Sequence, residues 1–566
     1  MLLNNGKKRL PLGYEDFKQI IDKRLYYVDK TMLIYELLKN GGLNNLITRP
    51  RRFGKTLNLS MLKYFLDITE RDNAYLFDGL KVSEHYNELA AYRNAYPVIS
   101  FSLKCGKQRN YKLALNSICR DIQAQFSKYS FIAGSEKLGE ADKKRFMMIV
   151  DALEYREEIF NESIKFLSSC LYQYYGTKVI ILIDEYDVPL ESAYFSGYYD
   201  EMVSFIRSLF ESALKTNPAL EFSVITGCLR ISKESIFTGL NNLITNTILD
   251  VKYSEFFGFE EDEVKALLEY YGLNERFELA KKWYDGYLFG KTEVYNPWSI
   301  MSYVNDLLTD PNALPAADWA NSSSNNIIRT LIGKADAETR DALERLVNGG
   351  SIETHLNETV TYGDLDDSDE NIWSFLFFTG YLRVKELVYS GAETGDRNIY
   401  SLTIPDLEIK SCYREMIMQY FDRYKKEVDR EALLKALLNG DAEGFAEQIT
   451  RLLKRSISFY DNKESFYHGL ISGLLTGAGD YKAESNRETG SGRSDLILYQ
   501  QGRFINAVIL EFKVCRENEE IDKAAKRALE QIEERGYAAE PETRGYRNIT
   551  KYGIAFKDKL CYAAKG

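Results

Sequence analysis

Apolar runs of strand length alternate with amphipathic segments along the N-terminal part of the chain. The apolar runs are Asn45–Thr48, Tyr96–Leu103, Lys178–Asp184 and Glu221–Gly227. Segments with the apolar spacing of a helix lie between them, for example Thr56–Asp67 and Glu201–Leu214. Continuous apolar strands separated by helices are typical of a parallel sheet that is covered on both faces. We therefore expect an α/β fold here, with helices on both faces of a parallel sheet.

The pattern changes twice further along the chain. After Gly258 it becomes mostly helical. Near Ser456 a second α/β pattern begins, with helices at Glu464–Leu475 and Ile521–Glu534 and strands near Asp495–Tyr499, Ala507–Val514 and Tyr552–Phe556. The sequence thus predicts three regions: an α/β domain over 1–257, a mostly helical accessory region over 258–450 and a compact α/β domain over 451–566.

Composition narrows the class of protein. At 566 residues the chain is too long for one hydrophobic core. It has no apolar run long enough to cross a bilayer, so we expect no membrane contact. Its 7 cysteines include no CxxC pair, which favours a reducing compartment and predicts a cytoplasmic protein. The net charge of -11 argues against a protein that coats nucleic acid indiscriminately.

A phosphate-binding loop is predicted where Leu46–Leu62 passes from an apolar strand to an amphipathic helix. Gly54, Lys55 and Thr56 match the second half of the pattern G-x-x-x-x-G-K-[ST], and Arg52 and Phe53 precede them in the loop. Lys55 would neutralise the β- and γ-phosphates, the Thr56 hydroxyl would bind Mg²⁺, and the helix N-terminus would face the anion. Arg49 stands where the first glycine of the pattern is expected. The simpler alternative is a basic turn capped by Thr56.

Three further positions at strand ends support a nucleotide site. Asp184 would bind the metal and Glu185 would polarise the water that attacks the γ-phosphate. Thr226 ends the next strand, where a polar residue can sense the γ-phosphate, and Arg230 could contact phosphate in its own chain or across a subunit contact of a homo-oligomer. The alternatives are that the acids only terminate a buried strand and that Arg230 is a solvated surface residue.

A second cluster of charged residues lies near the C-terminus. Asp495 precedes an apolar strand, a polar turn follows, and the next strand carries Glu511 and Lys513, which share one face of that strand. Two carboxylates that a hairpin brings together repel each other, and a divalent metal relieves the repulsion by binding both. Lys513 could position or deprotonate an attacking water. The alternative is an ordinary amphipathic strand with Glu511 and Lys513 paired across solvent.

The sequence resembles two known families. The segments YVDKTMLIYELL, LITRPRRFGKTLNLSMLKYF, ILIDEYDVPL and ITGCLRISKESIFTGLNNL resemble the bacterial AAA-ATPase-like family, whose members commonly carry a nuclease-like C-terminal domain. RPRRFGKT is typical of that family, so the resemblance implies a P-loop NTPase fold, ATP as the ligand and Arg49 as a family variant. Asp29 and Lys30 belong to a DKT motif that the family carries ahead of the loop, and the motif assigns them no chemical role.

Residues 456–566 resemble the PD-(D/E)XK nuclease superfamily through Asp495, Glu511 and Lys513. This resemblance implies a restriction-endonuclease-like α/β fold. It also implies that Glu464 joins the metal ligands and that Gln531 and Tyr537 contact the substrate. Arg487 and Arg493 would suit contacts to backbone phosphates. His468 is expected to be a packed side chain.

The two sites together lead to one hypothesis and one alternative. The hypothesis is a protein that binds and hydrolyses ATP, with Mg²⁺ as cofactor, and couples the nucleotide state to a metal-dependent nuclease that acts on DNA in preference to RNA. The alternative is a nucleotide-gated switch whose C-terminal domain binds nucleic acid or protein without cleaving it.

Overall fold

The computed structural model describes residues 6–231, 236–237, 242–319, 337–416, 429–455, 464–475, 479–489, 492–502, 505–516 and 519–566. The chain divides into two compact units. The first comprises Met1–Ser324 and Ser351–Cys412, and the second comprises Asn325–Gly350 and Tyr413–Gly566. None of the described helices is both long and apolar enough to cross a bilayer.

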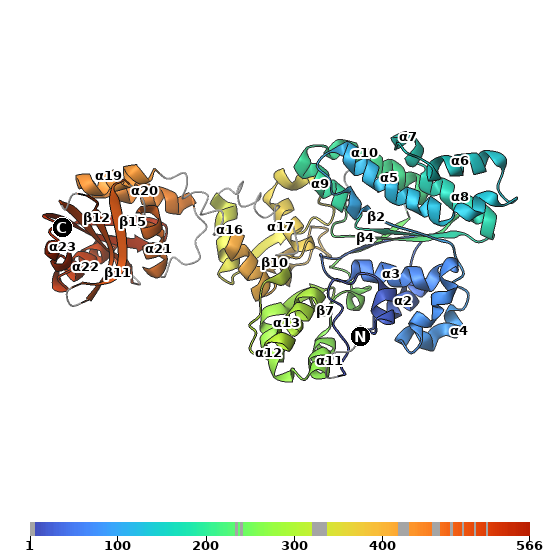
Figure 1. Ribbon diagram of the computed structural model, residues 1–566, viewed down its shortest axis with the longest axis horizontal. Helices are drawn as coiled ribbons and strands as arrows, with labels where there is room; N and C mark the ends of the chain where they lie inside the picture. Colours follow the sequence, from blue (N-terminus) through green and yellow to red (C-terminus); the bar gives the residue numbers. More distant parts are fainter. Residues whose placement is uncertain are drawn as a thin grey trace. The chain divides into compact units, whose positions relative to one another are not determined.

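The first unit is built on a five-stranded parallel sheet in the order β2-β3-β4-β1-β5 (Figure 1). Its strands are β1 (Asn44–Thr48), β2 (Val98–Ser102), β3 (Val179–Asp184), β4 (Leu220–Gly227) and β5 (Leu243–Asn246). The first four confirm the predicted strands. The short β5 was not predicted, because its four residues include only two apolar ones and form no apolar run of strand length.

Helices cover both faces of this sheet (Figure 1). One face carries α5 (Tyr111–Lys128), α8 (Ser163–Tyr175) and α10 (Tyr199–Phe210), and the other carries α3 (Lys55–Leu66). Shorter helices complete the layers: α1 (Phe17–Asp22), α2 (Met32–Asn40), α4 (Tyr86–Leu89), α6 (Glu140–Val150), α7 (Glu157–Phe160) and α9 (Val188–Ser196). This arrangement confirms the predicted α/β fold with a parallel sheet between two helical layers.

The pairing of the strands gathers their carboxyl ends at one edge of the sheet. Thr48 of β1 lies opposite Gly227 of β4, and Ser102 of β2 lies opposite Asp184 of β3. Ligands of open α/β sheets bind outside the carboxyl ends of the strands. The predicted phosphate loop, the acids after β3 and the turn after β2 therefore share one edge.

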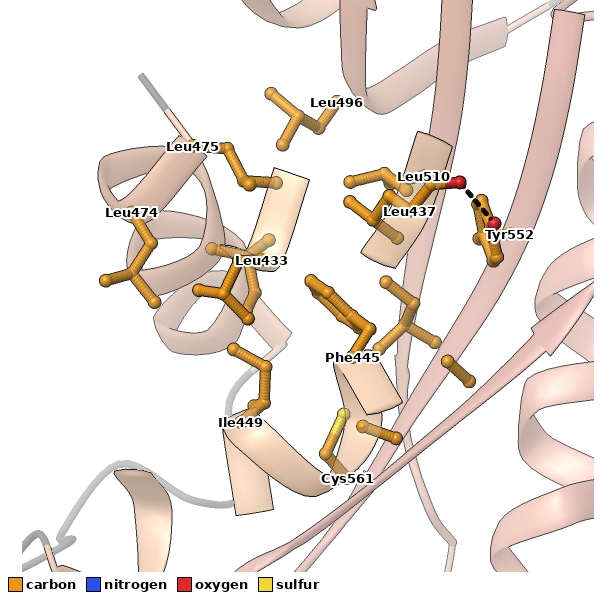
Figure 2. Close-up of a cluster of buried hydrophobic side chains, with 14 of the residues drawn as sticks. Leu433, Leu437, Phe445, Ile449, Leu474, Leu475, Leu496, Leu510, Tyr552 and Cys561 are labelled. Atoms are coloured by element: carbon orange, nitrogen blue, oxygen red, sulfur yellow. Dashed lines mark hydrogen bonds between the residues drawn. The ribbon is translucent and has the colours of Figure 1, made fainter. Parts of the chain in front are cut away.

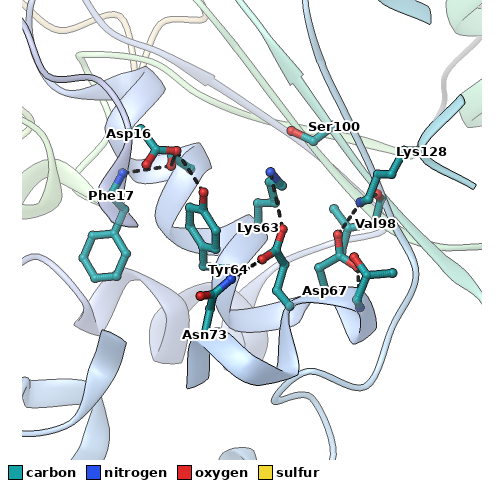
Figure 3. Close-up of polar contacts among 12 residues, drawn as sticks. Asp16, Phe17, Lys63, Tyr64, Asp67, Asn73, Val98, Ser100 and Lys128 are labelled. Carbon is teal, nitrogen blue, oxygen red and sulfur yellow. Dashed lines mark hydrogen bonds and ion pairs between the residues drawn. The ribbon is translucent and has the colours of Figure 1, made fainter. Parts of the chain in front are cut away.

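Helix α3, which follows the phosphate loop, is anchored by polar contacts near its C-terminal end (Figure 3). In its last turn, the Tyr64 hydroxyl donates to the Asp16 carboxylate over 3.1 Å. At its C-terminal end, the fully buried Asp67 accepts a hydrogen bond of 2.6 Å from Lys128 of α5. These contacts hold the helix in a fixed position, so its N-terminus presents the loop in one orientation.

The remainder of the first unit contains helices and two small sheets. Its helices are α11 (Glu261–Tyr271), α12 (Phe277–Tyr284), α13 (Pro297–Thr309) and α17 (Asp369–Phe378). The strands are the hairpin β6 (Asp285–Phe289) and β7 (Thr292–Tyr295), and the three-stranded sheet of β8 (Ile352–His355), β10 (Ile399–Thr403) and β9 (Arg383–Tyr389). The region expected to be mostly helical thus also contains strands, while the proposed domain boundaries at 257 and 450 stay predictions.

The second unit is a mixed five-stranded sheet in the order β11-β12-β13-β14-β15, with helices packed against it. Its strands are β11 (Tyr481–Thr489), β12 (Gly492–Gln500), β13 (Asn506–Val514), β14 (Asn548–Lys557) and β15 (Leu560–Lys565). The helices are α16 (Ala337–Val347), α19 (Arg430–Asn439), α20 (Ala442–Arg455), α21 (Glu464–Leu475), α22 (Ile521–Glu534) and α23 (Ala539–Thr543). The predicted helices at α21 and α22 and strands at β12, β13 and β14 are confirmed, whereas β11 and β15 were not predicted.

Two hydrophobic clusters show which helices cover which face of the sheet: α22 packs on one face, and α19, α20 and α21 pack on the other. Leu510 and Phe512 of β13 pack with α19, α20 and α21 (Figure 2). Ile509 packs with Ile532 of α22. Because side chains alternate along a strand, Glu511 leaves β13 on the same face as Ile509, so it faces α22.

Candidate nucleotide and nuclease sites

The loop between β1 and α3 has the backbone of a tight turn that leads directly into a helix. Gly54 precedes α3 with a φ of 83°, and an added Cβ would meet no atom within 4 Å. Arg52 also has a positive φ, 70°, a conformation that non-glycine residues adopt only at a cost. Strained residues of this kind concentrate at ligand-binding turns. The loop therefore presents backbone N–H groups and the N-terminus of α3 to one point.

Lys55 closes this turn with its side chain. Its ammonium group donates hydrogen bonds to the carbonyl oxygens of Arg49 and Pro50, both at 2.8 Å, and lies 3.8 Å from the sulfur of Cys228. The side chain is almost completely buried. A positive charge thus lies within the loop, where an anion held by the loop would meet it.

Asp184 is held by two hydroxyl groups from different elements. The Thr56 hydroxyl donates to one carboxylate oxygen of Asp184 over 2.7 Å, and the Thr226 hydroxyl donates to the other over 2.6 Å. The three side chains come from the start of α3 and the ends of β3 and β4. A carboxylate beside a threonine hydroxyl is an oxygen ligand set of the kind that Mg²⁺ prefers. The residues that sequence analysis assigned to Mg²⁺ are therefore in contact.

Glu185 follows Asp184 with a φ of 50°, and its side chain lines the same pocket as the loop. Burial raises the pKa of its carboxyl group, and the neighbouring Asp184 raises it further, while Lys55 and Lys104 oppose both effects. A carboxyl group with a raised pKa is a stronger base and is suited to accept a proton from water. This position and this pKa fit the predicted role of Glu185.

The loop opens into a pocket of about 320 Å³. Lys55, Gly54, Thr56 and Glu185 line one part of it. Aromatic residues line another part, namely Tyr26, Tyr27, Phe256, Phe259 and Trp298. The guanidinium of Arg52 lies 4.3 Å from the centre of the Trp298 ring. A charged part beside an aromatic part matches a ligand with a phosphate end and a flat ring, such as a nucleotide.

Sequence analysis did not single out these aromatic residues as ligand contacts. Trp298 belongs to the segment YNPWSI, which lies more than 200 residues beyond the loop in the chain. Tyr26 and Tyr27 lie ahead of the loop in the chain, and Phe256 and Phe259 lie some 200 residues beyond it. Only the fold brings them to one pocket, so local periodicity carries no signal for this assembly.

Arg49, which stands at the position of the first glycine of the pattern, does not point its side chain to solvent beside the loop. Its side chain is fully buried and donates to the carbonyl oxygens of Thr48, Asn246 and Thr247 at 2.8, 3.0 and 2.8 Å. The guanidinium also lies 5.3 Å from the ring centres of both Phe257 and Phe289. It ties β1 to the end of β5. Its role is therefore structural, which explains why arginine replaces the glycine of the usual pattern.

Arg230 is not brought to the phosphate-loop pocket. It lies 4.0 Å from the carboxylate of Glu358 and lines a separate hollow. The carboxylate that approaches it belongs to a segment more than 100 residues away, which the spacing of the motif could not reveal. The role of Arg230 as a phosphate contact within its own chain is therefore not supported by its position.

Asp29 and Lys30 fix the N-terminal segment. Asp29 accepts hydrogen bonds from Thr31 and from the backbone N–H of Lys81. Lys30 lines the pocket and donates to the carbonyl oxygen of Glu255 and to the carboxylate of Glu263, both at 2.6 Å. Lys30 therefore joins the start of the chain to α11 at the rim of the pocket.

In the second unit, the strands β12 and β13 bring the predicted carboxylates together. The Asp495 carboxylate accepts a hydrogen bond of 2.9 Å from the backbone N–H of Phe512, and the Asp495 backbone N–H donates to Glu511 over 3.4 Å. Lys513 donates to Glu511 and to Glu464, both at 3.1 Å. Four predicted residues from α21, β12 and β13 thus form one cluster.

The cluster is strongly coupled electrostatically. Glu511 is only 1% exposed, and burial together with the nearby Asp495 raises the pKa of its carboxyl group to about 7. Burial, opposed mainly by the Phe512 N–H, raises the pKa of Asp495 as well. Two nearby buried carboxyl groups repel each other when both are ionised, and a divalent cation would offset both the burial and the repulsion. Asp495 and Glu511 would hold such a cation, with Glu464 at the more exposed side.

Gln531 and Tyr537 connect this cluster to α22. The side-chain amide of Gln531 donates to a carboxylate oxygen of Glu511 and to the Tyr537 hydroxyl, the latter over 3.2 Å. Both residues line a hollow that also contains Arg516, Arg527 and Arg535. These arginines were not singled out from the sequence. The side chains of Arg487 and Arg493 lie outside the described residues, so their predicted phosphate contacts stay predictions.

His468 lies next to the cluster but contacts only its backbone. Its Nε2 is 2.8 Å from the carbonyl oxygen of Asp495, and its ring packs near Phe512. Within the described part of the chain, no group of three or more His, Cys, Asp or Glu side chains forms a ready-made metal shell. Lys513 supplies the cation that the carboxylates contact. The assignment of Mg²⁺ to this cluster therefore stays a prediction.

The geometry defines two classes of domain on one chain: a P-loop nucleotide-binding domain and an α/β domain with a D…ExK cluster. Residues 11–237 match the family model described as predicted AAA-ATPase, and residues 462–565 match the model described as the PD-(D/E)XK nuclease superfamily. The first segment is thus an AAA-ATPase-like domain and the second a PD-(D/E)XK superfamily domain. Both resemblances inferred from the sequence are confirmed.

Two individual proteins are also similar to this chain. An uncharacterized protein in the vnfD 5' region of Azotobacter chroococcum mcd 1 is 27% identical over 565 residues, which cover 97% of each chain. A Walker-type ATPase of Pyrococcus abyssi has a TM-score of 0.37 and 15% identity, covering 68% of this chain and 94% of the other.

Proposed function

We propose that this protein binds and hydrolyses ATP and that it couples the nucleotide state to cleavage of a nucleic acid, DNA in preference to RNA. The observation that carries the proposal is the contact of Thr56 with Asp184 at the floor of a loop that contains Lys55. Thr56 and Asp184 lie 128 residues apart in the sequence, and the fold brings them into contact beside Lys55. The D…ExK cluster of the second unit supports the nuclease part of the proposal in the same way.

In the first unit, the chain's own groups would act as follows. The loop from Arg52 to Gly54 and the N-terminus of α3 bind the phosphates, and Lys55 neutralises their charge. Thr56 and Asp184 would hold Mg²⁺, which, when bound, offsets charge on the phosphates. Thr226 orients Asp184. Glu185 orients the attacking water and accepts its proton.

In the second unit, Asp495, Glu511 and Glu464 would hold a Mg²⁺ ion, which stabilises charge on the scissile phosphate when it is bound. Lys513 orients the attacking water, and Gln531 fixes the Glu511 carboxylate. The arginines that line the hollow beside Gln531 can contact the backbone of the substrate. Because backbone contacts do not read bases, we expect little sequence specificity from this surface.

Three further assignments belong to the proposal. We place the protein in the cytoplasm, because its cysteines are free and Cys119, Cys170, Cys412 and Cys561 are buried as thiols. We propose that the protein forms a homo-oligomer. In it, Arg230 would contact the nucleotide bound to a neighbouring subunit, because it does not reach the phosphate-loop pocket of its own chain. We expect no membrane partner.

The test measures phosphate release and plasmid cleavage for the wild type, Lys55→Ala and Lys513→Ala. The first variant should lose phosphate release and the second should lose cleavage. Lys63→Ala on α3 and Lys551→Ala on β14 are matched controls, because these lysines pair with Glu70 and Glu533 at the surface. If both test variants retain both activities, the proposal is wrong.

A second candidate function is a nucleotide-gated switch that binds nucleic acid or protein without cleaving it. It is favoured by one observation: Lys513 already pairs with Glu511 and Glu464, so the carboxylates have a cation without any metal. This candidate predicts binding that depends on ATP, together with no Mg²⁺-dependent cleavage by the wild type.

A further inference from the structure

The turn after β2 carries two lysines into the nucleotide pocket. Lys104 belongs to the 3-10 turn η3 (Leu103–Gly106), and Lys107 directly follows it. Both lysines line the pocket together with Lys55, Thr56 and Glu185. Sequence analysis assigned no role to either residue. Both side chains are exposed, so their charges are available to a ligand.

The order of the strands explains this placement. β2 is the direct neighbour of β3, and Ser102 lies opposite Asp184 in the sheet. Lys104 therefore lies two residues after Ser102, the residue that pairs with Asp184, and beside the turn that carries Glu185. The Lys104 charge also acts on the Glu185 carboxyl group, although burial is the main influence on that group.

The turn that carries the lysines is fixed in position. An added Cβ on Gly106 would lie 2.9 Å from Pro189 of α9, so only glycine allows this close approach. The carbonyl oxygen of Gln108 accepts hydrogen bonds from the hydroxyls of Ser192 and Tyr198, at 2.9 and 2.5 Å. Helix α9 begins directly after Asp187. The lysine turn and the acidic turn are thus held against the same helix.

The contacts of Lys104 leave it able to bind a ligand. Its ammonium group lies 3.4 Å from the carboxylate of Glu15, and both side chains are more than half exposed. An exposed ion pair of this kind contributes little to stability, so a phosphate can replace the carboxylate at small cost. Glu15 also lines the pocket, so the ion pair lies at the proposed subsite.

We propose that Lys104 and Lys107 bind the γ-phosphate of the nucleotide that the loop holds. This inference rests on the proposed function. It assigns the charge that stabilises the terminal phosphate to the turn after β2 of the same chain. Lys55 contacts the phosphates from the loop side, and the two lysines contact the terminal phosphate from the side of Glu185. The subsite distinguishes a nucleoside triphosphate from a diphosphate.

The experiment is calorimetric titration of the full chain with the non-hydrolysable analogue AMP-PNP and with ADP, in the presence of Mg²⁺. The double variant K104Q/K107Q should bind AMP-PNP about 10-fold or more weakly, the effect of losing one hydrogen bond between charged groups. Its affinity for ADP should change less than about twofold, because ADP has no γ-phosphate. The kcat of phosphate release should fall as well.

Two further variants make the result specific. Arg109→Gln is the matched control, because Arg109 is an exposed cation of the same segment that does not line the pocket. It should bind both nucleotides as the wild type does. The variant K104R/K107R keeps the charges and should retain the preference for AMP-PNP.

Equal weakening of AMP-PNP and ADP in K104Q/K107Q, or no weakening of either, would overturn the γ-phosphate subsite while leaving the nucleotide site intact. Failure of the proposed function looks different: the wild type and Lys55→Ala would then bind AMP-PNP equally poorly. That result would remove the nucleotide site and this subsite with it.

Discussion

The Thr226 hydroxyl donates a hydrogen bond of 2.6 Å to the Asp184 carboxylate, across the boundary between β4 and β3. The other carboxylate oxygen accepts from Thr56. Asp184 is therefore held in one orientation by two neighbouring elements. Thr226 acts on the site through Asp184, which places it one contact further from the phosphates than its position in the sequence suggested.

Replacing Asp184 by asparagine should abolish efficient ATP hydrolysis. The substitution puts an amide N–H₂ where one of the two hydroxyls now donates, and it removes the negative charge that would hold Mg²⁺. We expect a loss of about 100-fold in kcat for phosphate release, as for other groups that act electrostatically on a transition state. Thr226→Val should have a smaller effect, since it leaves the charge in place. A larger loss in Thr226→Val than in Asp184→Asn would contradict this assignment.

Replacing Arg49 by methionine should destabilise the first unit. The buried guanidinium satisfies the carbonyl oxygens of Thr48, Asn246 and Thr247, and these would lose their donor. We expect the free energy of unfolding to fall by about 3 kcal/mol or more. Arg49→Lys should be nearly as unstable, because one ammonium group cannot replace the planar guanidinium.

Tryptophan fluorescence measures this effect selectively. The 4 tryptophans of the chain, Trp283, Trp298, Trp319 and Trp373, all belong to the first unit. Urea unfolding followed by their fluorescence therefore reports that unit alone. Arg52→Met is the control, and it should cost about 1 kcal/mol or less, because only a cation–π contact is lost. An Arg49→Met protein as stable as this control would show that the guanidinium has no structural role.

The stability of the first unit should depend on pH through Glu408. Burial raises the pKa of this carboxyl group to about 7. One carboxylate oxygen of Glu408 accepts a 2.8 Å hydrogen bond from the Trp319 backbone N–H. The other oxygen has no hydrogen-bond partner among the described residues. The buried carboxyl group of Asp406 is nearby. Because the folded-state pKa is above the unfolded one, the protonated group stabilises the fold at low pH. That stabilisation is lost as the pH rises through about 7.

Glu408→Gln should remove this dependence. The amide keeps an acceptor for Trp319 and carries no charge, so the variant should be more stable than the wild type at pH 8 by about 1 to 3 kcal/mol. At pH 5 the two proteins should be similar. The measurement is urea unfolding by tryptophan fluorescence between these two pH values. A wild type whose stability is constant over this range would contradict the prediction.

Gln531→Ala should lower nucleic-acid cleavage without affecting ATP hydrolysis. Its amide orients the Glu511 carboxylate, so its loss leaves that group free to turn away from Asp495. We expect cleavage to fall about 10-fold, as when a group that positions a metal ligand is removed. Tyr537→Phe, which removes only the hydroxyl that accepts from Gln531, should have a weaker effect. Unchanged cleavage by Gln531→Ala would show that the amide does not position Glu511.

Local patterns in the sequence determined most of the elements and the chemistry of both sites. The runs of buried apolar residues predicted β1 to β4, β12 and β13, because a strand buried on both faces needs no polar positions. We could choose Lys55, Asp184, Asp495, Glu511 and Lys513 because charged residues beside buried strands are costly, and Thr56 because it follows Lys55 in the loop motif. These signals are contained within a few neighbouring residues.

The tertiary structure alone decided which of these residues meet. It buried Arg49 under the end of β5, paired Arg230 with Glu358 and placed β2 beside β3, so that Lys104 and Lys107 line the same pocket as Glu185. It also assembled aromatic residues from Tyr26 to Trp298 around one pocket. The physical reason is that strand order and side-chain packing join segments more than 100 residues apart, whereas periodicity and motif spacing describe only neighbours along the chain.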